Sequence, residues 1–81
     1  MKIHIDKAIA LYTLRTGQPY TRKNLADKVL PEALPSTRQV IIKKYAEGRA
    51  VRPDPMLVWK IAEELGVDLN LLYGWNKTQE Q

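Results

Sequence analysis

Apolar residues recur at helical spacing in five segments of the chain, and glycines, prolines or capping residues separate these segments. The expected helices cover residues 5–16, 21–29, 36–47, 55–65 and 69–73. No segment shows the alternation of apolar and polar residues that is typical of a half-buried strand. The pattern therefore predicts an all-α fold, a bundle of five helices.

Residues with strong capping preferences mark the helix boundaries. The expected N-caps carry a side-chain oxygen: Thr21, Ser36, Asp54 and Asp68. The expected helix ends are the four glycines: Gly17, Gly48, Gly66 and Gly74. Gln39 follows Ser36 at the spacing of a capping box, so these two residues are expected to start the third helix.

The connection between the second and third helices is expected to be a loop over residues 30–35. Pro31 and Pro35 forbid a continuous helix there. Leu30 and Leu34 are expected to hold this loop to the core.

The third helix combines an apolar face with a basic face. Its apolar face is formed by Ile41, Ile42 and Tyr45. Polar side chains that donate hydrogen bonds fall largely off that face: Arg38, Gln39, Lys43 and Lys44. Such a helix suits a DNA major groove. The same pattern is also that of an ordinary amphipathic helix with a solvated basic side, and this segment alone favours neither interpretation.

The distribution of charge adds to this picture. The 81-residue chain has a net charge of +4. Residues 22–52 carry eight basic and three acidic side chains, a net charge of +5, and the remainder carries −1. Positive charge concentrated in one part of the chain indicates an anionic partner.

Composition excludes several classes of function. The chain has no cysteine, and its one histidine, His4, lies in an N-terminal segment that is expected to fray. We therefore expect no metal site, no cofactor and no catalytic residues, and hence no enzyme. No segment is long and apolar enough to span a membrane, so a cytoplasmic protein is expected. Residues 1–75 are expected to form one domain, followed by a disordered polar tail over residues 76–81.

Three motifs occur in a characteristic order. The run Ile-Ala-Glu-Glu-Leu-Gly-Val-Asp-Leu-x-x-Leu covers residues 61–72, an Arg-x-x-Arg-Pro loop covers residues 49–53, and Leu-Ala-x-Lys-Val covers residues 25–29. Together they resemble the Cro and Xre-like (phage-repressor) helix-turn-helix DNA-binding family over residues 5–75. The resemblance implies a helix-turn-helix formed by the second and third helices. Residues 30–35 depart from it, because the family usually has a shorter turn there.

The resemblance also implies roles for individual residues. The base-contacting positions fall on Arg38, Gln39, Val40, Lys43 and Lys44. Contacts to the DNA backbone fall on Arg22, Lys23, Ser36, Thr37, Arg49 and Arg52. Two alternatives stay open within this set: Gln39 cannot fully serve both a capping box and a base, and if Val40 is buried the reading face rotates towards Lys43.

These roles describe a bacterial transcriptional regulator, expected to be a repressor, that binds a two-fold operator on double-stranded DNA as a homodimer. The candidate dimer contacts are Leu69, Leu72 and Trp75, and the two leucines serve equally well as core residues. One alternative function is an antitoxin that also binds a toxin protein. Another is a protein-interaction module without DNA binding, in which Trp59 and Trp75 are exposed anchors.

Overall fold

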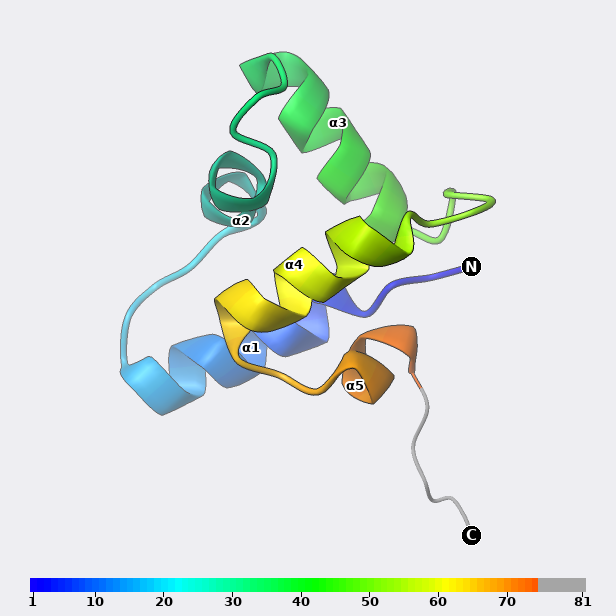
Figure 1. Cartoon of the computed structure of the whole chain (residues 1–81). Helices are drawn as coiled ribbons and strands as arrows, with labels where there is room; N and C mark the ends of the chain where they lie inside the picture. Colours follow the sequence, from blue (N-terminus) through cyan, green and yellow to red (C-terminus); the bar gives the residue numbers. More distant parts are fainter. Residues whose placement is uncertain (75–81) are drawn as a thin grey trace, which may run out of the picture.

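The computed structural model describes residues 1–74, which form five α-helices and no strand, so the predicted all-α fold is confirmed (Figure 1). The helices are α1 (Ile5–Thr16), α2 (Arg22–Val29), α3 (Pro35–Ala46), α4 (Pro55–Leu65) and α5 (Leu69–Tyr73). Their bounds agree with the expected ranges to within one residue at each end. Trp75 and the predicted tail 76–81 lie outside the described residues.

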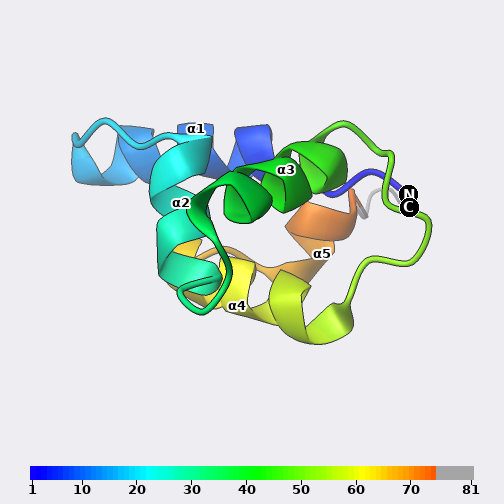
Figure 2. The same ribbon diagram turned by 90° about the horizontal axis from the view of Figure 1, so that it is seen from above.

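The five helices enclose a single core. Viewed from above, α1 and α4 lie on opposite sides, α2 and α5 close two ends, and α3 lies across the face towards the viewer (Figure 2). In Figure 1, α2 is seen nearly end-on while α3 runs across the picture, so these two helices cross steeply. The contacts of α3 are most extensive with α2. As a result, α3 forms an outer edge of the bundle.

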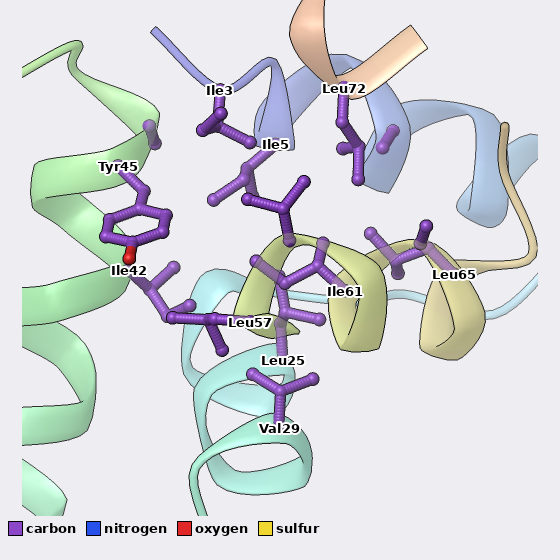
Figure 3. Close-up of a cluster of buried hydrophobic side chains, with 14 of the residues drawn as sticks. Ile3, Ile5, Leu25, Val29, Ile42, Tyr45, Leu57, Ile61, Leu65 and Leu72 are labelled. Carbon is purple, nitrogen blue, oxygen red and sulfur yellow. The ribbon is translucent and has the colours of Figure 1, made fainter. Parts of the chain in front are cut away.

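Every helix contributes side chains to the core, and none of the buried side chains in residues 1–74 is polar or charged. Figure 3 shows how the labelled side chains converge from α1, α2, α3, α4, α5 and the N-terminal segment. Those that are fully buried are Ile3, Ile5, Leu25, Ile42, Val58, Ile61, Leu65 and Leu72. Burial of this apolar surface is the main favourable term in folding.

Most predicted caps are confirmed. Thr21 and Asn24 form a reciprocal capping box, and Asp54 and Asp68 each accept a backbone hydrogen bond at the start of their helices. All four glycines have positive φ. The predicted Ser36–Gln39 capping box is wrong. Helix α3 begins one residue earlier, with Leu34 as its N-cap and no capping side chain, because Pro35 has the φ required at the first helical position and lacks an N–H group that would have no partner within the helix.

Two other expectations are wrong. Leu34 does not hold the loop to the core, because its side chain is 72% exposed. The N-terminal segment does not fray, because Ile3 is fully buried and its N–H donates to the Tyr45 carbonyl at 3.0 Å. The next residue, His4, donates its N–H to the Leu72 carbonyl at 2.7 Å. The segment thus bridges α3 and α5, and the apolar Ile3 side chain occupies the space between them.

Long side chains hold α4 against the first half of the chain. Arg15 donates to the carbonyl oxygens of Leu65 and Gly66 at 2.6 and 3.2 Å, which satisfies the C-terminal end of α4. The Tyr20 hydroxyl donates to Glu64 at 2.9 Å. Burial, together with this carboxylate, raises the pKa of the Tyr20 hydroxyl.

Among the described helices, none is long and apolar enough to cross a membrane.

The packing of the N-terminal segment leads to a first prediction. Ile3→Ala should lower the free energy of unfolding by about 2–5 kcal/mol, because it removes a fully buried side chain. Val51→Ala is the matched control. Val51 is 88% exposed, so its truncation should change stability by no more than about 0.5 kcal/mol. Urea unfolding followed by circular dichroism measures both, and equal effects would contradict the role of Ile3 in the core.

Candidate nucleic-acid interface

One face of α3 is anchored in the core. Ile42, Tyr45 and Ala46 are buried, and Ile41 is partly buried. The apolar face predicted from the sequence is therefore confirmed. This anchoring decides which way the remaining side chains of α3 point, because residues three or four positions apart share a face.

The opposite face of α3 is open to solvent. The exposed side chains on it are Ser36, Thr37, Gln39, Val40, Lys43 and Lys44. Val40 is 59% exposed, so the alternative in which it is buried and the face rotates is excluded. No acidic residue occurs in α3. The face thus combines hydrogen-bond donors, positive charge and one small apolar side chain.

The basic side chains predicted to contact DNA fall into two groups, those that form no ion pair and those that form one. Within the described part of the chain, Lys43, Lys44 and Arg52 form no ion pair. Lys23 and Arg49, in contrast, pair with Asp27 and Glu47, in each case with an N–O distance of 3.0 Å.

Arg22 is also paired. Its Nε donates to an Asp6 carboxylate oxygen at 2.8 Å, and this hydrogen bond lowers the pKa of the Asp6 carboxyl below its ordinary value of 3.8. The pair is well exposed, as are those of Lys23 and Arg49. Exposed pairs contribute only about 0–1 kcal/mol, so an incoming anion can displace Asp6 from Arg22 and Glu47 from Arg49 at small cost.

Arg38 does not point to the open face of α3. Its guanidinium donates to the carbonyl oxygens of Ala33 and Pro31, both at 2.7 Å, and to a carboxylate oxygen of Asp27 at 3.1 Å. The side chain is only 20% exposed. Arg38 is therefore bound to the connection between α2 and α3, and it does not lie with the other predicted base-contacting residues on the open face of α3. The cause is the long loop, which supplies carbonyl oxygens within reach of the first turn of α3.

A hollow of about 400 Å³ adjoins the open face, between α3, the 50–54 loop and α4. Lys44, Arg52 and Lys60 line it, above apolar side chains that include Ile41 and Leu57. Lys60 was not among the predicted site residues. The apolar period of α4 indicates only that Lys60 is not a core residue. Nothing in the local sequence indicates that the fold places it near α3.

The candidate dimer contacts have different environments. Leu72 is fully buried, so its prediction as a dimer contact is wrong and its alternative role in the core is confirmed. Leu69 is partly buried. Trp75 lies beyond the described range. Trp59 is 48% exposed and, with Met56 and Leu69, lines a shallow apolar hollow at the start of α4.

Comparison with known proteins returns nothing for this chain: no family model, no curated protein and no solved structure matches it. Among residues 1–74, no group of three or more His, Cys, Asp or Glu side chains is placed to hold a metal ion.

The Asp6–Arg22 pair leads to a second prediction. Because the folded-state pKa of Asp6 is lowered, the stability that the pair contributes is present above the ordinary pKa of 3.8 and is lost as the pH falls below it. Asp6→Asn should therefore reduce the loss of stability on acidification below about pH 4. Urea unfolding over this range measures the effect. Glu32→Gln, an exposed carboxylate outside the ion pairs described above, is the control, and an unchanged slope in Asp6→Asn would contradict the prediction.

Proposed function

We propose that the protein is a sequence-selective DNA-binding transcriptional regulator, a repressor of the Cro and Xre-like helix-turn-helix type, in which α3 enters the major groove. The observation that carries the proposal is the division of α3 into two faces. One face is anchored through Ile42 and Tyr45, and the other presents Gln39, Val40 and Lys43 to solvent. A rigid helix with a free polar face fits a groove about 12 Å wide, because an α-helix measures about 10–12 Å across.

The exposed side chains match the chemistry of base edges. Gln39 can form two hydrogen bonds with adenine, and Lys43 can donate to guanine. Val40 can contact the methyl group of thymine. Since Gln39 has no role in a capping box, its amide is free for this contact. Lys44, at the edge of the face, suits either a base or a phosphate.

Basic side chains of two segments next to α3 add to the proposed footprint. Arg22 and Lys23 lie in the first turn of α2, where backbone N–H groups also favour an anion. Arg49 and Arg52 lie in the loop that follows α3. Contacts of this kind position a protein on the duplex without reading its sequence. Replacement of Asp6 and Glu47 by phosphates would release the paired arginines for this role.

One helix of this length reads few base pairs, so the proposal includes a homodimer on a two-fold operator. A second candidate function, binding of a protein partner such as a toxin, is favoured by the exposed apolar side chains of Met56 and Trp59. Both lie on α4, and Met56 also lines the hollow beside α3, so the two surfaces adjoin at this residue.

The test is selection of binding sites from a random duplex pool, followed by titration of the selected site at several salt concentrations. The expected result is a two-fold motif with a steep negative dependence of affinity on salt. A single half-site would contradict the dimer. Binding without any motif, or no binding, would overturn the proposed function.

A third prediction concerns the base-reading face. Gln39→Ala should weaken binding to the selected site by about 1–3 kcal/mol and relax preference at one base pair of each half-site. Electrophoretic mobility shifts with single-base variants of the site measure this. Equal losses at every sequence would contradict base contact by Gln39.

A fourth prediction concerns the flanking charge. Arg52→Gln should weaken binding to all sequences alike and reduce the slope of log affinity against log salt by about 1, because one phosphate contact is lost. Fluorescence anisotropy with the selected site and with an unrelated duplex measures both quantities. A loss confined to the selected site would place Arg52 among the base-reading residues instead.

A further inference from the structure

The connection between α2 and α3 has little apolar anchorage. Leu30 and Ala33 are partly buried, whereas Pro31, Glu32 and Leu34 are exposed. A backbone hydrogen bond from the Ala33 N–H to the Leu30 carbonyl, at 3.2 Å, forms a turn within this connection. A loop of this length, held so weakly by its own residues, does not by itself define the angle at which α3 leaves it.

Arg38 supplies the missing constraint. From the end of the first turn of α3 its guanidinium reaches Ala33 and Pro31 in the loop and Asp27 in α2. One planar group therefore joins three consecutive segments of the chain, and its rigid fork makes the arrangement directional. Lys23 bonds to the other oxygen of Asp27 at 3.0 Å, so the carboxylate is held from both sides. These two cations lower the pKa of Asp27.

We propose that Arg38 is a positioning residue that sets the pose of α3 on DNA, so that sequence discrimination depends on a side chain that contacts no base. This inference rests on the proposed function. Arg38 directly precedes Gln39 and Val40 in α3, and it ties the same turn of the helix to α2. Its three hydrogen bonds therefore fix the turn that presents the reading side chains.

Loss of this constraint affects base contacts and phosphate contacts differently. A bidentate contact with a base edge requires close alignment, and a displacement of about 1 Å is enough to break it. Contacts with phosphates come from flexible, charged side chains and tolerate such a displacement. We call the three hydrogen bonds of Arg38 to Ala33, Pro31 and Asp27 the clamp. Its loss should lower the ratio of the affinities for selected and unrelated duplexes, with little change in the salt dependence of binding to unrelated DNA.

The experiment compares Arg38→Gln with Asp27→Asn, which change the net charge in opposite directions. The readout is the ratio of the dissociation constants for an unrelated duplex and for the site selected by the wild-type protein. Both variants should lower this ratio, by about tenfold for Arg38→Gln, because both weaken the same clamp. If charge alone acted, Asp27→Asn would tighten binding to every duplex, Arg38→Gln would weaken it, and the ratio would stay constant in both. That result would overturn the proposal.

Arg38→Lys distinguishes the effect of the planar guanidinium group from that of its positive charge. A single ammonium group keeps the charge but cannot reproduce the three hydrogen bonds, so discrimination should stay reduced. Full discrimination in Arg38→Lys would overturn the proposal. Thermal unfolding of each variant ensures that binding is compared among folded proteins. If Arg38→Gln does not fold, Asp27→Asn and Arg38→Lys carry the test.

The two proposals fail in different ways. A wild-type protein that selects no site overturns the proposed function, and the role of Arg38 with it. A wild-type protein that selects a site, with variants that discriminate equally well, overturns the positioning role alone.

Discussion

The rest of the structure depends on the burial of Tyr45. Its ring packs into the core from α3, its hydroxyl accepts a hydrogen bond from the Asp54 N–H at 2.8 Å, and its carbonyl accepts one from the Ile3 N–H at 3.0 Å. One residue thus joins α3 to the start of α4 and to the N-terminal segment. Because these contacts fix the rotation of α3 about its own axis, they also decide which of its side chains face solvent.

The basic residues have different roles in the structure, although the sequence alone does not distinguish them. Arg15 and Arg38 bind backbone carbonyl groups of the protein itself, and Lys43 and Lys44 stay free of ion pairs in the described structure. Arg22 is intermediate in availability: it forms an ion pair, but its exposed partner Asp6 can be exchanged for a phosphate at small cost. The net charge of the central segment therefore overstates the positive charge that is directly available to an anionic partner.

Helix positions were largely predictable because their signals are local. A threonine or aspartate before a helix and a glycine after it act within one turn, and the apolar period of each segment shows which face is buried. The start of α3 was mispredicted for a local reason as well. Pro35 can itself occupy the first helical position, and it therefore takes precedence over Ser36.

The candidate site was only partly predictable. The sequence by itself determined the all-α fold, the helix bounds to within one residue and the apolar face of α3, because neighbours in the chain decide all three. Only the tertiary structure decided that Arg38 holds the loop, that Lys60 lies beside Lys44 and Arg52, that Leu72 is core, and that the N-terminal segment is packed. Each of these depends on contacts between residues that the fold brings together, and the hydrogen bonds and burial involved leave no periodic trace in the sequence.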